Sequence, residues 1–304
     1  MGTEGGDGRA ESLPHRLGGT EERGRPLGAT GRFRGPREEF DRQGRADLVL
    51  ELTLDPQGPF RRADGVVDTA EMEVGQARDP RGVPVVAGSG AVFVMAPDGV
   101  PIAYEFVELA VAEGVSRLVL LSSKAIDTMN DTRLLAAERA VTSAGVESTV
   151  VRADWFDQNF DEGFLRDAVL AGDVVVPLGD VRQAFNDAED IAAVAVVAPT
   201  EPGHAGRTYE LSGPDALSFG EATAIVARES GRPVRYRGEP DAYLETMTGF
   251  GLDRAQVLAE IEAFEALRAT GDVTPNDVVA EVTGRPPISF ETYARGAAAR
   301  GAWA

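Results

Sequence analysis

Small and polar residues follow three apolar segments of the sequence, at points where strands would end. They are Ala96 with Pro97, Ser122 with Ser123, and Ala153 with Asp154 and Trp155. Ligands of an open parallel sheet bind beyond the carboxyl ends of the strands, so we expect these residues around one pocket. Small side chains let a flat ligand approach the backbone, and serine hydroxyls could bond a carboxamide or a substrate oxygen. The alternative is that the two serines only end a strand and open a turn.

The elements that position these residues alternate between strand and helix from Ala91 onward. We expect strands over 91–97, 116–123 and 147–153, and helices over 102–114 and 132–143, closed by Gly114 and Gly145. Strands that are apolar on both faces and alternate with helices of this length indicate a parallel sheet covered on both sides. The sequence therefore predicts an α/β, Rossmann-like, doubly wound fold.

Beyond Asp154 the alternation loosens, as expected for a lobe laid over the strand ends. Helices are expected over 162–171, 188–197, 253–269 and from Phe290 onward, with strands near Val174 and over 207–213. Another helix should begin after Ser218, because Glu221 three residues later completes a capping box. We interpret residues 154–304 as a smaller C-terminal α/β substrate lobe, interleaved with the same domain.

The N-terminal part is harder to interpret. Residues 1–45 are crowded with Gly and Arg and show neither strand nor helix periodicity, which is typical of an irregular or disordered segment. Residues 46–153 form the expected Rossmann-like cofactor part, with strands predicted over 47–54 and 82–86.

Composition excludes several classes of function. The chain has 304 residues and no cysteine, which removes thiol nucleophiles and thiolate metal sites, and no set of His and carboxylates has metal-ligand spacing. The net charge of −20 disfavours nucleic acid as a partner. No apolar run is long enough to span a bilayer and no signal-peptide pattern is visible, so we expect a cytoplasmic protein with a small-molecule substrate. The oligomeric state is left open.

Four segments carry a resemblance to a known family. GVSRLVLLSS, RLLAAERAVTSAGVESTVVRADWFDQNF, AFNDAEDIAAVAV and RTYELSGPDALSFGEA occur in the order and spacing of NmrA-like atypical short-chain dehydrogenases. The resemblance covers about residues 91–304. Within the family, GRPVRY and GRPPISFETYA are similar to bacterial relatives of the ergot-alkaloid reductases, the festuclavine or agroclavine type.

The resemblance implies a Rossmann fold, an NAD(P)H cofactor and hydride transfer to a small hydrophobic substrate of conjugated or iminium type. It also implies that Ala96, Pro97, Ser122 and Asp154 line the cofactor and that Trp155, Phe156 and Asn159 face the substrate. Asp190 matches a position that we expect to be structural, as a carboxylate at a helix N-terminus. Two alternatives stay open: a non-catalytic NAD(P)-sensing regulator of the NmrA type, and a degenerate paralogue with an impaired cofactor site. The choice between NADH and NADPH is undetermined.

The acid–base pair of typical short-chain dehydrogenases is missing. That pair is a Tyr and a Lys four residues apart, whereas Lys124, the only lysine among thirty basic residues, follows Leu120 at that spacing. No catalytic residue is therefore assigned. Reduction of a cationic carbon needs only a positioned hydride, so the absence favours an iminium or quinone-like acceptor over a simple ketone.

The phosphate-binding loop also departs from the family pattern. In LGATGRFRG, Gly28 and Gly31 match the start of the family's GxTGxxG and would contact the cofactor, but Arg34 occupies the third glycine position. The preceding EERGRP cannot form the buried strand that delivers such a loop to a helix N-terminus. The sequence therefore predicts weak NAD(P)H binding. A degenerate or frame-shifted segment upstream of about residue 88 would show this incomplete glycine motif without a strand before it.

Overall fold

The computed structural model describes residues 52–54, 61–62, 86, 88–96, 101–102 and 104–304. All of them belong to one compact unit that covers residues 37–304. The expected irregular head over 1–45, Gly28, Gly31 and Pro97 lie outside the described residues.

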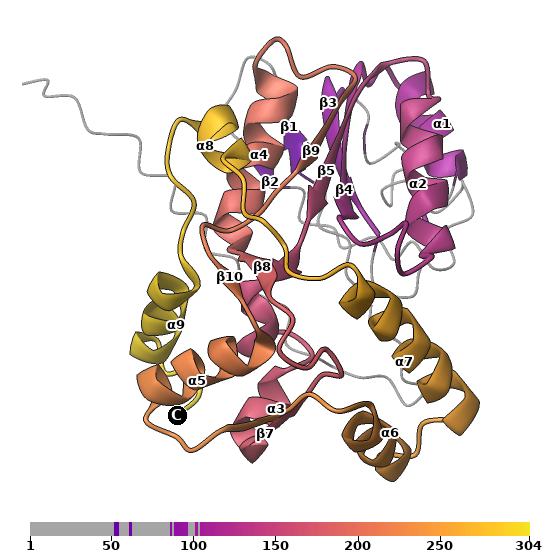
Figure 1. Cartoon of the computed structure of the whole chain (residues 1–304). Helices are drawn as coiled ribbons and strands as arrows, with labels where there is room; N and C mark the ends of the chain where they lie inside the picture. Colours follow the sequence, from indigo (N-terminus) through magenta and orange to yellow (C-terminus); the bar gives the residue numbers. More distant parts are fainter. Residues whose placement is uncertain (1–51, 55–60, 63–85, 87, 97–100, 103) are drawn as a thin grey trace, which may run out of the picture. The chain divides into compact units, whose positions relative to one another are not determined.

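A parallel sheet forms the centre of the first lobe (Figure 1). Its strands β3 (Ala91–Met95), β4 (Arg117–Ser123), β5 (Glu147–Ala153) and β9 (Arg207–Glu210) are adjacent in that order and parallel. The Rossmann-like prediction is confirmed for these strands. At the outer edge, β1 (Leu52–Leu54) pairs antiparallel with β3 and with β2 (Arg61–Arg62).

Helices cover both faces of this sheet, and the alternation of side chains along β4 explains why. Leu118 and Leu120 pack under α1 (Tyr104–Ala112) and α2 (Thr132–Thr142). Val119 and Leu121 point to the opposite face, where α4 (Ala188–Thr200) packs. Because successive residues of a strand face opposite sides, a strand that is apolar throughout needs a helix layer on each side. Figure 1 shows the two layers on either side of the sheet.

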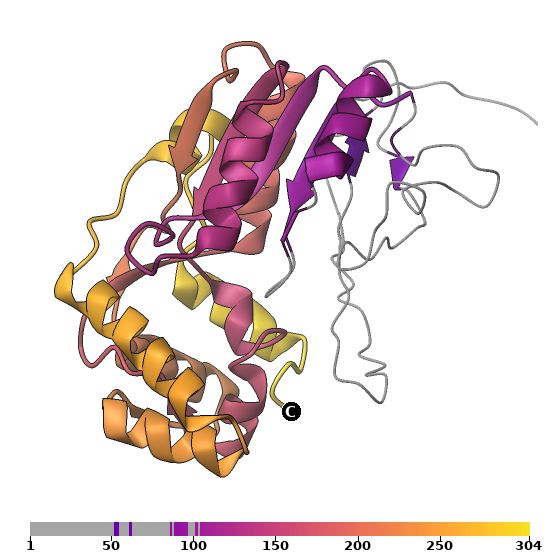
Figure 2. The ribbon, with the colours of Figure 1, turned by 90° about the vertical axis from the view of Figure 1, so that its right-hand side faces the viewer.

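The chain passes directly from β5 into the second lobe through β6 (Trp155–Phe156). The remaining elements are η1 (Asp157–Phe160), α3 (Arg166–Ala171), β7 (Asp173–Val175), β8 (Gln183–Asn186), β10 (Ala216–Leu217), α5 (Phe219–Ser230), β11 (Arg235–Arg237), α6 (Pro240–Gly249), α7 (Arg254–Ala269), α8 (Val278–Thr283) and α9 (Phe290–Ala299). β8 lies between β10 and β6, and β7 pairs with β11. In Figure 2, α6 and α7 lie side by side as a helical hairpin.

An aromatic cluster forms the core of the second lobe. Phe185 packs edge-on against Phe219, and Phe160 packs edge-on against both Phe185 and Phe290. The indole N–H of Trp303 donates a hydrogen bond to the Phe160 carbonyl at 2.8 Å. The last turn of the chain is therefore tied into the same core.

Most of the expected elements after Ala91 are confirmed, including the Ser218–Glu221 capping box. The helix expected from residue 162 begins only at Arg166, after a turn. Val86, the one described residue of the strand expected over 82–86, lies in a turn. The short strands β6, β8, β10 and β11 and the helices α6 and α8 were not expected. None of the described helices is long and apolar enough to cross a membrane.

Candidate functional site

The parallel register brings the predicted strand-end residues to one edge of the sheet. Met95 lies opposite Leu121 and Ser123 lies opposite Ala153, so Ser123 ends its strand where Ala96 and Asp154 follow the neighbouring two. The N–H of Lys124 donates to the Ala153 carbonyl at 3.0 Å, which extends the pairing one residue beyond the strand. The carboxyl ends of these strands therefore lie at one edge of the sheet, and a single pocket around them stays a prediction.

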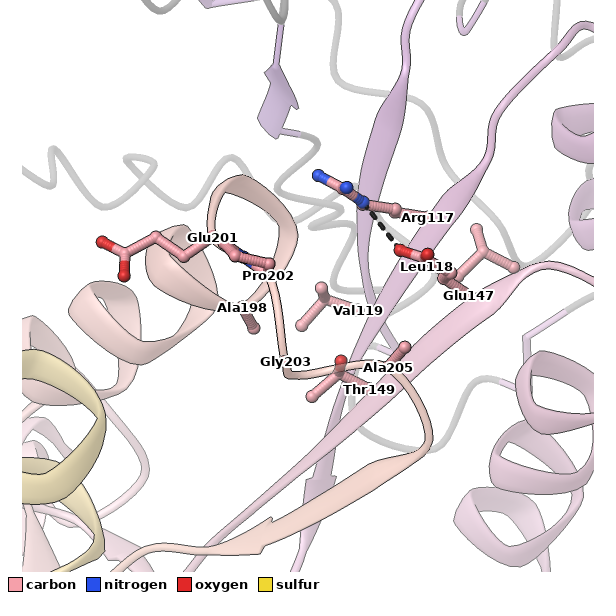
Figure 3. Close-up of a pocket in the computed structure, with 10 residues that line it drawn as sticks. All are labelled: Arg117, Leu118, Val119, Glu147, Thr149, Ala198, Glu201, Pro202, Gly203 and Ala205. Atoms are coloured by element: carbon pink, nitrogen blue, oxygen red, sulfur yellow. Dashed lines mark hydrogen bonds and ion pairs between the residues drawn. The ribbon is translucent and has the colours of Figure 1, made fainter.

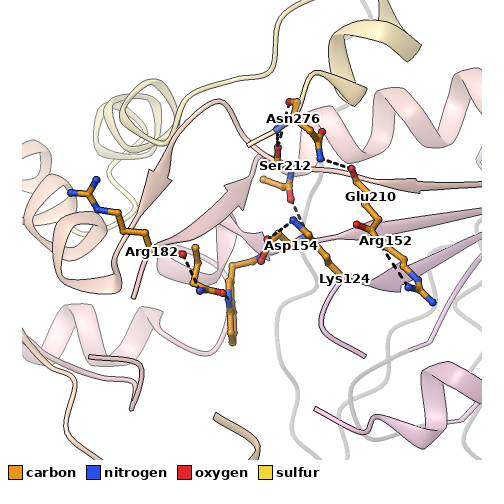
Figure 4. A network of polar contacts seen from close by, with 10 residues as sticks. Lys124, Arg152, Asp154, Arg182, Glu210, Ser212 and Asn276 are labelled. Carbon is orange, nitrogen blue, oxygen red and sulfur yellow. Dashed lines mark hydrogen bonds and ion pairs between the residues drawn. The ribbon is translucent and has the colours of Figure 1, made fainter. Parts of the chain in front are cut away.

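Lys124 and Asp154 form an ion pair at this edge. Their side chains point toward one another (Figure 4), with Nζ 3.8 Å from Oδ2. The Asp154 side chain is only 8% exposed and that of Lys124 23%. Burial raises the pKa of the Asp154 carboxyl to about 6, although the Lys124 ammonium and the N–H of Trp155 oppose that rise. The pair is thus partly withdrawn from water at the strand ends.

Asn186, the last residue of β8, joins this pair. Its Oδ1 accepts a hydrogen bond from the Asp154 backbone N–H at 2.9 Å, while Asp154 Oδ1 accepts from the Trp155 N–H at 3.0 Å. Within the described part of the chain, two buried atoms of these side chains have no hydrogen-bond partner: Asn186 Nδ2 and Asp154 Oδ2. Buried polar groups are almost always paired, so a donor and an acceptor left over on adjacent residues indicate a place for a ligand.

The Ser122 hydroxyl has a different role from the one expected for it. It donates to Glu138 Oε1 at 2.7 Å, and Arg152 binds both carboxylate oxygens of Glu138 at 2.8 Å. Burial raises the pKa of Glu138, but the hydrogen bonds from Arg152 and Ser122 outweigh it and leave the pKa below its usual value. Ser122 therefore helps to fasten β4 and β5 to helix α2.

Trp155 lies where the sheet edge meets the second lobe. Its ring is parallel to that of Phe264 on α7, with centroids 6.3 Å apart, and meets Phe219 on α5 edge-on. Its indole N–H donates to Gln183 Oε1 at 3.3 Å. These contacts fix the plane of the indole directly beside Asp154.

The other two residues expected at the substrate, Phe156 and Asn159, follow Trp155 in β6 and η1. Phe156, next along β6, packs with the core on the α4 face of the sheet. Asn159 lies in η1, where its carbonyl accepts the N–H of Leu165. Lys124 and Asn186 were not selected as site residues from the sequence. Strand-end placement would have selected Asn186 if the four-residue strand β8 had been recognised.

A small cavity lies at the opposite, amino edge of the sheet (Figure 3). Its volume is about 100 Å³, room for about three water molecules and far less than a dinucleotide needs. Arg117 at its rim donates to Glu147 at 2.8 Å and to the Pro199 carbonyl at 2.7 Å, and Thr149 donates to the His204 carbonyl. These polar groups are already paired, so this cavity is not the candidate site.

A buried acidic residue lies just beyond Trp155. Asp157 is 0% exposed, and within the described residues neither of its carboxylate oxygens has a hydrogen-bond partner. Burial, and then the charges of Asp187, Asp190 and Asp161, raise its pKa well above the usual value. Asp190 itself, in the first turn of α4, is bound by Arg285 and by the Ile288 N–H, which confirms the structural role expected for it.

Four parallel strands with helices on both faces define a Rossmann-type fold. Its polar carboxyl edge, next to the second lobe, is the edge at which such folds bind ligands. No family model matches the chain. The chain is 32% identical to an NAD(P)H azoreductase of Xenophilus azovorans over 74% of its own length and 82% of that protein. It is 31% identical to festuclavine synthase I of Penicillium roqueforti, over 67% and 73% of the two chains.

Among solved structures, the NADPH complex of the Escherichia coli quinone oxidoreductase QOR2 is similar, with a TM-score of 0.58 and 20% identity. The match covers 75% of this chain and 82% of that one and concerns the fold alone. With these relatives, the chain belongs to the NmrA-like family of atypical short-chain dehydrogenases that its sequence resembles. It is an oxidoreductase-type member of the family, as its similarity to the azoreductase indicates.

Proposed function

We propose that this protein is an NAD(P)H-dependent reductase that transfers a hydride to a small, hydrophobic, conjugated acceptor. The observation that carries the proposal is a pair of buried atoms at the carboxyl edge of the sheet: Asn186 Nδ2, which has no hydrogen-bond partner among the described residues, and Asp154 Oδ2, which accepts no hydrogen bond from them and lies 3.8 Å from the Lys124 ammonium. Its 32% identity to an NAD(P)H azoreductase supports the same chemistry.

These residues fit a nicotinamide ring. A carboxamide offers one acceptor oxygen and N–H donors, which are the groups that Asn186 Nδ2 and Asp154 Oδ2 lack. Ala96, Ser123 and Ala153 present small side chains at the same edge, so a flat ring is not kept away from the backbone. We therefore assign Asp154 and Asn186 to the carboxamide and the small strand-end residues to the ring.

When bound, the dihydronicotinamide supplies the hydride. Trp155, fixed against Phe264 and Phe219, orients a flat acceptor beside the carboxamide position. The apolar side chains around Trp155 exclude water from the acceptor, which strengthens the electrostatic interactions of the reacting groups. Positioning and exclusion of water are thus the main contributions of these residues to the rate.

The assignment is tested by changing the carboxamide. We expect nicotinic acid adenine dinucleotide phosphate, which carries a carboxylate in its place, to bind about tenfold more weakly than NADP⁺, because the new charge faces Asp154. Quenching of tryptophan fluorescence measures both affinities at millimolar ligand. Equal affinities would contradict the assignment.

Steady NADPH consumption with a conjugated acceptor is expected of a reductase, whereas a sensor of the NmrA type binds the cofactor without turnover.

A further inference from the structure

We propose that Lys124, held by Asp154, donates the proton that accompanies hydride transfer, so that the preferred acceptor is a neutral azo, quinone or enone compound rather than a preformed cation. The inference rests on the proposed reductase function. It supplies the proton donor that the missing Tyr–Lys pair would otherwise provide.

The position of Lys124 supports this role. It follows the end of β4, its backbone is bonded to the end of β5, and its ammonium lies 3.8 Å from Asp154 Oδ2 (Figure 4). Asp154 immediately precedes Trp155, the residue assigned to the acceptor. The ammonium therefore lies at the edge where the acceptor would be reduced.

The chemistry of the side chain supports it as well. An ammonium has three N–H bonds, so the contact with one carboxylate leaves others to donate. Lysine can release a proton at a site that tunes its basicity, whereas arginine stays protonated. Every other basic residue apart from the two histidines is arginine, yet lysine occupies this position.

The proposed step balances for a neutral acceptor. The hydride adds to one atom of an N=N, C=O or C=C–C=O system, the π bond breaks, and its electron pair moves to the far heteroatom. That atom takes a proton from Lys124 Nζ, an N–H or O–H bond forms, and Lys124 is left as the amine until water reprotonates it. The acceptor gains two electrons while the dihydronicotinamide is oxidised.

A preformed iminium cation needs no proton and would be repelled by the ammonium. The lack of a Tyr–Lys pair pointed to cationic or quinone-like acceptors, and Lys124 narrows this expectation to the neutral ones.

Few charged groups of the described residues face the pair. Glu210 on β9 adds to the rise in the Asp154 pKa, and Arg152 on β5 lies 3.8 Å from Glu210. At pH 7 the Asp154 carboxyl, with a pKa of about 6, is mostly ionised and holds the ammonium in place. Asp154 is therefore a positioning residue for the donor.

The test compares two acceptors at millimolar NADPH: 4-(dimethylamino)azobenzene, which is neutral, and N-methyl-3,4-dihydroisoquinolinium, which is a cation. In Lys124→Met, kcat on the azo dye should fall about 100-fold or more, the usual contribution of a general acid. The Kd for NADPH should stay within about threefold, and kcat on the cation should not fall, because that acceptor needs no proton and is no longer repelled. Lys124→Arg should keep cofactor affinity without restoring the azo rate. In the wild type, the rate on the azo dye should rise through about pH 6 as Asp154 ionises. Asp154→Asn should abolish that rise.

A second readout does not depend on turnover. Because Lys124 is the only lysine, [¹³Cε]lysine labelling gives one NMR signal from this side chain. That signal should move with a midpoint near pH 6 as Asp154 ionises, and the step should be absent in Asp154→Asn.

The outcomes separate the two proposals. Wild-type turnover of the azo dye with an unchanged rate in Lys124→Met, or equal losses on both acceptors, would overturn the role of Lys124 alone. Absence of the NMR step would overturn the ion pair on which it depends. A wild-type protein that consumes NADPH with neither acceptor would overturn the reductase function itself, and the proton transfer with it.

Discussion

The two edges of the parallel sheet differ in how their polar groups are satisfied. At the amino edge there is a cavity, but Arg117, Glu147 and Thr149 around it are paired with protein groups. At the carboxyl edge, Asp154 Oδ2 and Asn186 Nδ2 are buried without hydrogen-bond partners. On this difference we base the proposal that the ligand binds at the carboxyl edge and not in the small cavity.

The difference follows from strand direction. At the amino ends of β4 and β5, Arg117 and Glu147 bond to each other and Thr149 bonds to the His204 carbonyl. At the carboxyl ends, strands β4 and β5 deliver Lys124 and Asp154 to a place that β8 and the second lobe also reach. Ligand chemistry in such sheets gathers at this edge for that reason.

The largest effect should come from restoring the phosphate loop. A chimera with an apolar strand and an intact GxTGxxG turn placed before Ala91 should bind NADPH about 100-fold more tightly than the natural chain. Its backbone amides would then converge on the pyrophosphate, whereas the nicotinamide contacts at the carboxyl edge would be unchanged. Fluorescence titration of both chains measures the gain, and micromolar binding by the natural chain would refute the predicted weakness.

A smaller loss is expected from Trp155→Ala. Removal of the ring should lower kcat/KM for the acceptor about 10–100-fold, because an aromatic surface that orients the acceptor is lost. The Kd for NADPH should change less than about threefold. Trp155→Phe, which keeps a ring but loses the bond to Gln183, serves as the control for packing. If cofactor binding fell while acceptor turnover at saturation did not, the roles assigned to this edge would be reversed.

A change in stability is expected from Asp157→Asn. The folded pKa of Asp157 lies above that of the unfolded chain, so its carboxyl destabilises the fold increasingly as pH rises from about 4 through the folded pKa. The variant should therefore raise Tm by about 2–6 °C at pH 8 and by less at pH 5. Thermal melts at both pH values check this, and an equal change at both would show that Asp157 is not the titrating group.

The smallest effect is expected at the amino edge. Arg117→Gln removes a half-exposed ion pair with Glu147, which is worth at most about 1 kcal/mol. Tm should fall by no more than about 4 °C, and neither NADPH affinity nor acceptor turnover should change more than about twofold. A large loss of cofactor affinity would move the site to the edge that we exclude.

The first lobe could be predicted from the sequence because its signals are strong and local. The apolar strand over 117–123 and the helices ended by Gly114 and Gly145 need no tertiary information to be recognised. The second lobe was only partly predicted. The strands β6 and β10 have two residues each, too few to show alternation, and they exist because β8 pairs with them.

The site shows the same division. Strand-end placement selected Asp154 and Trp155, since both follow a strand that the sequence displays clearly. It did not select Asn186, because β8 was not recognised. It also did not predict that the Ser122 hydroxyl donates to Glu138 on helix α2, which Arg152 binds as well. Which polar atoms remain unpaired depends on the whole fold and cannot be read from spacing.

The central claim, that the nicotinamide binds at the carboxyl edge, is tested most directly by the single lysine signal. In [¹³Cε]lysine-labelled protein at fixed pH, millimolar NADP⁺ should shift the Lys124 resonance, because its ring would lie beside the ion pair with Asp154. Adenosine diphosphate ribose 2′-phosphate, which lacks the nicotinamide, should leave the resonance in place. An unchanged signal with NADP⁺, or the same shift with both ligands, would contradict the account.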